Sequence, residues 1–104
     1  MASAACVLVV DDDPAIRHML SDYLTSEGYC VAVAADGESM RREIEQATPD
    51  LVLLDLKLPR EDGLSLARFL RERYDVGIIM VTGASGEVDR IVGLEVGADD
   101  YVTK

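Results

Sequence analysis

Short runs of apolar, mostly β-branched residues alternate along this chain with stretches of helical periodicity. This alternation constrains the fold more than any other feature. A run that is apolar throughout suits a strand buried on both faces of a sheet, and five such strands are expected over residues 6–10, 29–34, 51–54, 77–81 and 100–103. Strands separated by helices form parallel sheets with right-handed crossovers. The chain is therefore predicted to be a doubly wound α/β domain with five parallel strands.

Four helices are expected between the strands. In the first, Asp13 is suited to the N-cap and Pro14 to the first helical position, and Gly28 closes the helix. The other helices follow Asp36, Gly63 and Gly86. Apolar residues recur at helical spacing in all four, and Met19 is expected to face the core. The positions with this spacing are Ile16, Met19, Leu20, Tyr23, Leu24, Met40, Ile44, Ala47, Leu66, Ala67, Leu70, Tyr74, Val88, Ile91 and Val92.

Size and charge exclude several classes of protein. The 104 residues, 49% of them hydrophobic, suffice for one small domain. Twenty acidic against ten basic residues give a formal charge of −10, which disfavours nucleic-acid binding by this surface. No apolar run reaches the roughly 18 residues of a membrane span, and residues 1–5 lack the basic start of a secretory signal. We expect a soluble cytoplasmic domain with no membrane partner.

The two cysteines lie at the starts of expected strands. Cys6 and Cys30 show no metal-ligand spacing and are too few for a disulfide scaffold. They are interpreted as buried small hydrophobic residues rather than as a disulfide or redox pair. His18, on the first helix, is interpreted as a surface residue.

Polar residues follow the expected strands at the points where they end. Asp11 and Asp12 follow the first strand, Asp55 the third, Thr82 the fourth and Lys104 the fifth. Ligands of open α/β sheets bind at this edge. Clustered carboxylates repel one another and favour a hard cation such as Mg²⁺. A cation and an ammonium group around one carboxylate could hold a phosphoryl group, and Asp55 is the best nucleophile candidate.

Four motifs together resemble a known family. They are Val9-Val10-Asp11-Asp12-Asp13, Leu53-Leu54-Asp55-Leu56-Lys57-Leu58-Pro59 with Asp62-Gly63, Val81-Thr82-Gly83, and Gly97-Ala98-Asp99-Asp100-Tyr101-Val102-Thr103-Lys104. In this order and spacing they resemble the receiver domain of two-component response regulators, over essentially the whole chain. The last motif resembles the winged-helix transcription regulators (the OmpR/PhoB subfamily). The expected fold is then flavodoxin-like, with strand order 2-1-3-4-5.

The resemblance implies a role for each matching residue. Asp55 would accept the phosphoryl group from a sensor histidine kinase. The domain would catalyse only its own Mg²⁺-dependent phosphorylation and dephosphorylation. The metal ligands, for Mg²⁺ or Mn²⁺, would be Asp55, Asp12, Asp11 (mainly through water) and the backbone carbonyl of Lys57. Lys104 and Thr82 would contact the phosphoryl group. Tyr101 would move inward with Thr82 and carry the signal to the outer face as a population shift.

The chain departs from the family pattern in two respects. It ends at Lys104, before a fifth helix, so we expect residues 1–104 to be a truncated receiver whose DNA-binding domain lies in a further segment. Truncation should expose apolar surface near the first and fifth strands and reduce stability or cause self-association. Val92 stands where many subfamily members have a basic residue. A homodimer therefore stays open for this truncated form, although the mode that uses the fourth helix, fifth strand and fifth helix is disfavoured.

Three alternatives remain open at this stage. The chain could be a stand-alone receiver that acts through protein–protein contacts. A phosphatase with an aspartyl-phosphate intermediate usually has a second Asp two residues after the nucleophile, where this chain has Lys57. A flavin-binding domain shares the fold, but the acidic loop after the first strand would repel a flavin phosphate.

Overall fold

Parallel strands and helices alternate along the chain, as the sequence predicts. The computed structural model describes residues 5–55, 57–58, 60–82 and 100–103, and for 57, 82 and 100–103 it describes the backbone alone. The elements are β1 (Cys6–Val10), α1 (Pro14–Ser26), β2 (Cys30–Ala34), α2 (Gly37–Gln46), β3 (Leu51–Asp55), β4 (Lys57–Leu58), β5 (Glu61–Asp62), α3 (Gly63–Arg73), β6 (Gly77–Thr82) and β7 (Asp100–Thr103). The predicted fourth helix falls outside the described residues.

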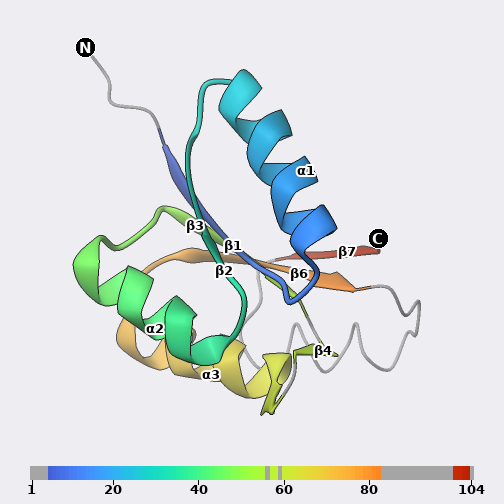
Figure 1. Ribbon diagram of the computed structural model, residues 1–104. Coiled ribbons are helices and arrows are strands. Elements are labelled where there is room, and N and C mark those ends of the chain that lie inside the picture. The colour runs from blue at the N-terminus through green and yellow to red at the C-terminus, as the bar shows by residue number, and fades with distance from the viewer. Residues whose placement is uncertain (1–4, 56, 59, 83–99, 104) are drawn as a thin grey trace.

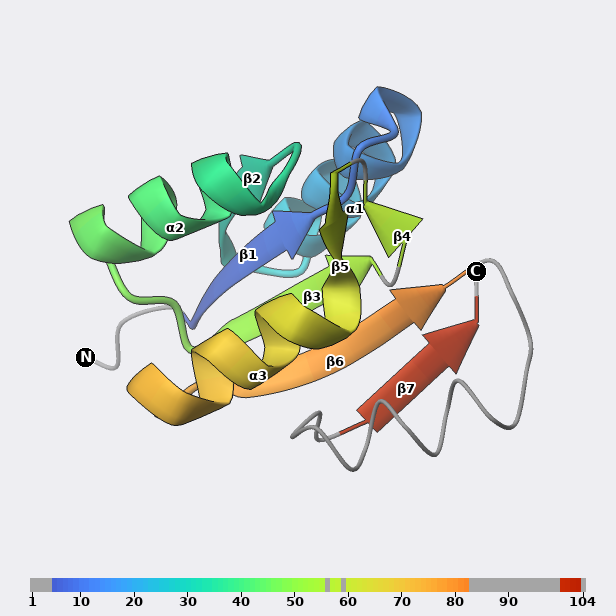
Figure 2. The same ribbon diagram turned by 90° about the horizontal axis from the view of Figure 1, so that it is seen from below.

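Five strands form one parallel sheet with the order β2-β1-β3-β6-β7. The predicted order is confirmed, since β6 and β7 are the fourth and fifth of the long strands. All five run in the same direction across the sheet (Figures 1 and 2). Their carboxyl ends therefore meet at a single edge, which is the edge where ligands bind in this class of fold.

The ends of α1 follow from local sequence. The Asp13 carboxylate accepts a hydrogen bond from the Ala15 amide at 2.9 Å, as expected of an N-cap. At the other end, the Tyr29 N–H donates to the Leu24 carbonyl at 3.0 Å. Gly28 has a φ of 95°, a conformation that favours glycine. This is the Schellman arrangement, so the predicted helix end is confirmed.

A short antiparallel hairpin follows β3, and the sequence analysis did not anticipate it. Lys57 pairs with Asp62 and Leu58 with Glu61. Arg60 lies between the two strands with a φ of 66°, a left-handed conformation that is uncommon for a residue other than glycine. Two-residue strands carry too little pattern to be recognised from sequence. The hairpin places the segment after Asp55 beside the edge of the main sheet.

Helices cover the two faces of the sheet, with α1 on one face and α2 and α3 on the other (Figures 1 and 2). The face under α2 and α3 holds the principal apolar core. Its buried residues are Leu8, Val10, Ala34, Met40, Ile44, Val52, Leu54, Leu58, Leu66, Ala67, Leu70, Val76, Ile78 and Met80. Alternate residues of β1, β3 and β6 thus point to this face, as the two-residue period of a strand requires.

The other face differs from the expectation in one respect. All thirteen residues of α1 are described, and none of them is buried. Met19, predicted to face the core, is 56% exposed, and Tyr23 is 61% exposed. The prediction was wrong because apolar spacing defines one side of a helix but does not specify what packs against it.

The apolar exposure predicted near the first strand is found beside that strand, whereas β1 itself is covered. Val7 and Val9 are buried, since α1 packs over β1 and β2. Val33 of β2, which pairs with Val9, is 42% exposed, and Leu53 of β3 and Ile79 of β6 are partly exposed. The side chains of β7, the fifth long strand, are not described.

The interpretation of the cysteines as buried residues is wrong as well. Cys6 is partly buried and Cys30 is exposed, and both are free thiols. Cys30 is the first residue of β2, which lies at one edge of the sheet. An edge strand has a neighbour on one side only, and its first residue extends beyond the core.

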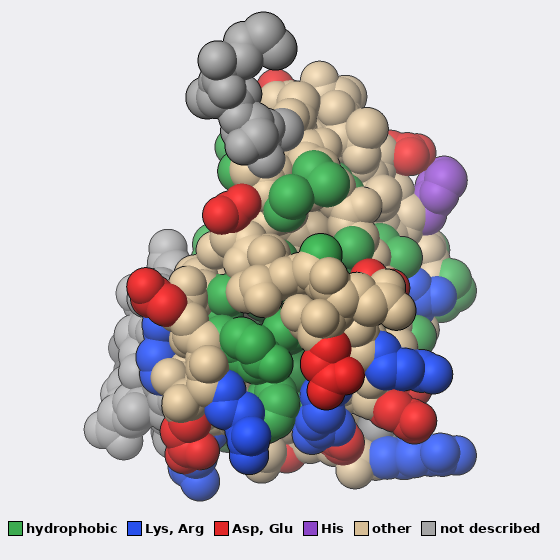
Figure 3. Space-filling model, turned by 90° about the vertical axis from the view of Figure 1, so that its left-hand side faces the viewer, with side chains coloured by type: hydrophobic (Ala, Val, Ile, Leu, Met, Phe, Trp, Pro, Cys, Tyr) green, Lys and Arg blue, Asp and Glu red, His purple; other side chains and the backbone are tan. Residues whose placement is uncertain are grey.

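The surface is mixed in charge on the side where α2 lies. Acidic and basic side chains are interspersed there around a smaller hydrophobic area (Figure 3). His18 is exposed on α1, as expected, and pairs with Asp22 at 3.1 Å. Within the described part of the chain, every helix falls short of the length and hydrophobicity that a bilayer crossing requires.

Candidate functional site

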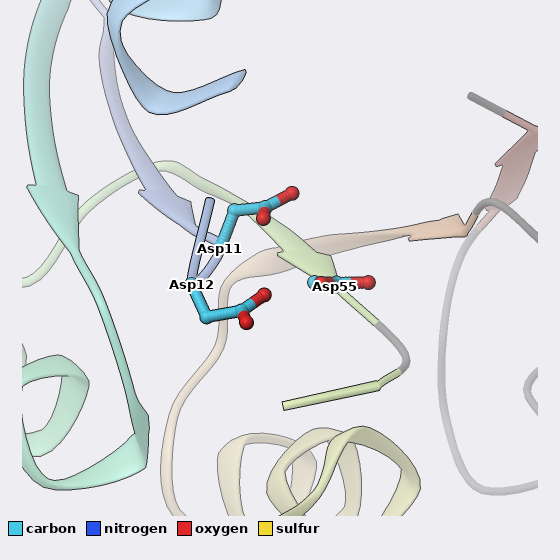
Figure 4. A group of neighbouring side chains, drawn as sticks. All are labelled: Asp11, Asp12 and Asp55. Carbon is cyan, nitrogen blue, oxygen red and sulfur yellow. The ribbon is translucent and has the colours of Figure 1, made fainter. Parts of the chain in front are cut away.

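Three acidic side chains meet at the carboxyl ends of β1 and β3. Val10 pairs with Leu54 across these two strands, so the next residues, Asp11 and Asp55, are neighbours at the edge of the sheet. Asp12 follows directly. In Figure 4 the three carboxylates project from the tips of the two strands toward the same side. The parallel register therefore brings together residues that lie 44 positions apart in the sequence.

The cluster is tight and unevenly buried. One carboxylate oxygen from each of Asp11, Asp12 and Asp55 lies within 4.8 Å of the others. Asp11 is 2% exposed and Asp55 is 5% exposed, whereas Asp12 is open to solvent. The cluster therefore contains two buried carboxylates and one that solvent can reach. Mutual repulsion at these distances favours the binding of a cation.

Hydrogen bonds from the following turn fix the position of Asp11. Its Oδ1 accepts the Asp13 N–H at 3.0 Å, and its backbone carbonyl accepts Arg17 Nη1 at 2.8 Å. Its own N–H donates to the Ala34 carbonyl at 3.1 Å, which extends the β1–β2 pairing by one residue. The start of α1 thus orients the acidic loop, and Asp13 acts as a cap rather than as a fourth member of the cluster.

The donor set fits a small hard cation. Mg²⁺ prefers oxygen ligands at about 2.0–2.1 Å and keeps several waters. Two ligands of one ion are then at most about 4.2 Å apart, so an upper separation of 4.8 Å requires only a small inward rotation of the side chains. Exposure of Asp12 leaves room for the waters. Cysteine and histidine, which softer metals prefer, are not among these three ligands.

The other predicted site residues are placed less completely. Lys57 begins β4, two residues after Asp55, and its backbone carbonyl is the atom expected to bind the metal. Thr82 is the last residue of β6, one position beyond Val81, which pairs with Asp55. Tyr101 pairs with Met80 from β7. The side chains of these three residues are not described, and Lys104 lies outside the described residues.

A pocket of about 470 Å³ adjoins the cluster on the side of α2. It is lined by Asp12, Ala35, Asp36, Gly37, Glu38, Arg60 and Glu61. Arg60 is a residue that the sequence analysis did not single out, because its place beside Asp12 depends on the β4–β5 hairpin. The signal available in the sequence was a second basic residue, besides Lys57, between Asp55 and Asp62. The pocket gives solvent and small ions a path to Asp12.

Asp36, on the wall of this pocket, is a structural residue. It caps α2 by accepting the Ser39 N–H at 2.8 Å, and the Ser39 hydroxyl donates to it at 2.7 Å. The hydrogen bond from the Ser39 backbone, followed by that from its side chain, holds the pKa of Asp36 below its usual value. Arg42 and Arg60 lower this pKa further through their charge. Asp36 therefore keeps its charge to lower pH, at the edge of the pocket.

Comparison with known proteins agrees with this fold. Residues 7–104 match the response regulator receiver domain. The chain is 54% identical to the TorCAD operon transcriptional regulatory protein TorR of Escherichia coli over 98 residues, which cover 94% of this chain and 43% of TorR. It is 52% identical to the transcriptional regulatory protein AruR of Pseudomonas aeruginosa, covering all of this chain and 45% of AruR. The chain thus spans less than half of these two relatives.

A solved structure gives the same result. The receiver domain of the TMAO respiratory system response regulator TorR superposes with a TM-score of 0.91 and 53% identity, over 96% of this chain and 83% of that one. The residues of segments 77–83 and 89–95 predict a resemblance to that regulator, and the sequence identity and the superposition confirm it.

This chain belongs to the family of response-regulator receiver domains. Its relatives TorR and AruR place it near the winged-helix transcription regulators, as the motif ending at Lys104 predicts. Receiver domains are signalling modules, and the family assignment separates this chain from the phosphatase and flavin-binding alternatives. The carboxylates of Asp11, Asp12 and Asp55 form an acidic cluster at the edge of the sheet where ligands bind in this class of fold.

Proposed function

We propose that this chain is a phosphorylation switch that accepts a phosphoryl group on Asp55 from a sensor histidine kinase. The acidic cluster at the ends of β1 and β3 supports this proposal most directly. A carboxylate oxygen of Asp55 attacks the phosphorus atom, a new O–P bond forms, and the N–P bond to the donor histidine breaks. Asp55 is the last residue of β3, an interior strand of the sheet, and its pairing with Val81 of β6 fixes its position.

The rest of the site is assigned around this nucleophile. Asp12, Asp11, Asp55 and the backbone carbonyl of Lys57 hold Mg²⁺, with Mn²⁺ as a substitute. When bound, this ion neutralises negative charge that builds up on the phosphoryl oxygens. Lys104 pairs with the same oxygens, and Thr82 donates a hydrogen bond to them. Tyr101, three residues before Lys104, moves with Thr82 and alters the outer face of β7.

The proposed biological role is that of the regulatory part of a DNA-binding transcription regulator in the cytoplasm. The support is that TorR and AruR are transcriptional regulatory proteins and that the chain spans 43% and 45% of them. DNA would then be bound by a segment outside these 104 residues, as the formal charge of −10 also favours. A stand-alone receiver is the alternative, and the full reading frame of the gene distinguishes the two.

The first prediction concerns the phospho-acceptor. Incubation with Mg²⁺ and acetyl phosphate should add one phosphoryl group to the intact protein, measured by mass spectrometry. Asp55→Asn should abolish this addition, since an amide is not a nucleophile at phosphorus. Asp75→Asn is a matched control, because Asp75 is exposed and lies outside the cluster. Labelling that persists in Asp55→Asn would refute the assignment.

The second prediction concerns the metal. Asp12→Ala should weaken Mg²⁺ binding by at least roughly tenfold, since even partners outside the ligand set contribute 10–100-fold in metal sites. NMR titration of the backbone amides measures this affinity without requiring phosphorylation. Asp75→Ala serves as the control, because Asp75 is exposed and lies outside the cluster. An unchanged affinity in Asp12→Ala would exclude Asp12 as a ligand.

A further inference from the structure

The two cysteines occupy paired positions on neighbouring strands. Cys6 of β1 lies opposite Cys30 of β2 in the parallel register. The Cys30 N–H donates to the Ala5 carbonyl at 2.9 Å, which fixes the pairing at this end. Residues paired across parallel strands project to the same face of the sheet. The register therefore places two thiols side by side, although they are 24 positions apart in the sequence.

The distance between the strands suits a disulfide. Adjacent strands lie about 4.7–4.9 Å apart, and disulfides join residues whose Cα atoms are about 4.4–6.8 Å apart. The side chain of Cys30 raises the pKa of Cys6 through hydrogen bonding, as expected of two thiols at paired positions. Partial burial raises the same pKa further, as do the negative charges of Cys30 and Asp50.

The two thiols differ in access. Cys30 is exposed, whereas Cys6 is partly buried beside it. An oxidant from solution therefore meets Cys30 first, and Cys6 is placed to complete the reaction. An exposed thiol next to a second, resolving thiol is the arrangement found in reversible redox pairs.

We propose that Cys6 and Cys30 form a reversible dithiol–disulfide pair, a modification site at the amino end of the sheet. The oxidant is a small-molecule disulfide. The Cys30 thiolate attacks one of its sulfur atoms, breaks the S–S bond and releases one small thiol. The Cys6 thiolate then attacks the Cys30 sulfur and releases the second. The two protein thiols are oxidised, the small disulfide is reduced, and the two protons end on the released thiols.

This site is separate from the acidic cluster. Cys6 and Asp11 stand near opposite ends of β1, roughly 16 Å apart at about 3.3 Å per residue. The disulfide would tie the first residue of the edge strand β2 to the interior strand β1. The proposal therefore does not depend on the assignment of Asp55 as phospho-acceptor.

The test is a mass-spectrometric map of the wild-type chain after incubation with oxidised glutathione. The intact mass should fall by two hydrogen atoms. Trypsin cuts after Arg17 and Arg41 and so separates the two cysteines. They should appear in one disulfide-linked peptide pair that dithiothreitol releases.

Two serine variants sharpen this test. In Cys6→Ser the reaction should stop at a mixed disulfide of glutathione with Cys30, present at roughly ten times its level in the wild type or more, since the resolving thiol is lost. In Cys30→Ser, Cys6 should react more slowly than Cys30 does. The proposal would be overturned if the wild type kept glutathione on Cys30 at the same level as Cys6→Ser does. A covalent dimer through Cys30, formed at the same level in both proteins, would overturn it as well. The wild-type peptide map decides the question even if a variant folds poorly.

Discussion

The two faces of the sheet contain similar apolar side chains but are covered differently. Under α2 and α3, Met40, Ile44 and Leu66 are each at most 1% exposed. On the other face α1 contributes no buried residue, and its Met19 and Tyr23 are more than half exposed. Helical periodicity is present in both regions. The difference shows that an apolar stripe indicates which side of a helix can be buried, whereas burial itself depends on neighbouring elements.

The largest expected effect is on the free energy of unfolding. Leu66→Ala on α3 should reduce it by about 2–5 kcal/mol, because the substitution leaves a cavity in the closed core. Met19→Ala on α1 should change it by less than about 0.5 kcal/mol, since Met19 is largely in solvent. Urea denaturation followed by circular dichroism measures both values. Similar losses from the two substitutions would show that the two faces are packed equally well.

A smaller difference is expected between the coupling free energies of the ion pairs on the two faces. Arg41 Nη1 of α2 lies 2.9 Å from Glu61 Oε1 of β5, with side chains 39% and 31% exposed. The Arg41 guanidinium also lies 5.1 Å from the centre of the Phe69 ring of α3, so it connects three elements. A double-mutant cycle with Arg41→Gln and Glu61→Gln should give a coupling of at most about 1 kcal/mol.

The matched pair on α1 is His18 and Asp22, with side chains 80% and 70% exposed. Its coupling in a cycle with His18→Gln and Asp22→Asn should be lower still, at about 0.3 kcal/mol, and requires protonated histidine. A coupling on α1 as large as that of Arg41 with Glu61 would contradict the distinction between the faces.

The smallest expected effect is a pH dependence on the side of α2. The pKa of Asp36 is lowered in the folded chain by the Ser39 hydrogen bonds. Its contribution to stability is therefore present above the ordinary pKa of 3.8 and is lost as the pH falls through the lower folded pKa. Asp36→Asn should be less stable than the wild type at neutral pH, and the difference should disappear in acid. Urea denaturation across this pH range measures it, and a constant difference would exclude the carboxylate as its cause.

Much of the main sheet could be predicted because each strand has its own local signal. The apolar runs predicted the five long strands, and Asp13-Pro14 and Gly28 predicted the two ends of the first helix. The resemblance added the strand order. The β4–β5 hairpin was not foreseen, since its strands have only two residues each, and neither was the exposure of Met19, which depends on what packs against α1.

The site was predictable to a similar degree. Asp11, Asp12 and Asp55 were identified because each directly follows or ends an apolar run, and the structure brings them together. Arg60 was not, because its position beside Asp12 depends on the turn of the hairpin. The assignments of Thr82, Tyr101, Lys57 and Lys104 remain predictions.

The sequence by itself determined which segments form the five long strands and which carboxylates lie at their ends, because strand formation and helix capping depend on neighbouring residues. The tertiary structure alone decided that α1 leaves Met19 in solvent and that Arg60 lines the pocket. It also decided that Cys6 and Cys30 stand side by side at the amino end of the sheet. These features depend on contacts between segments distant in sequence, which local patterns of hydrophobicity do not encode.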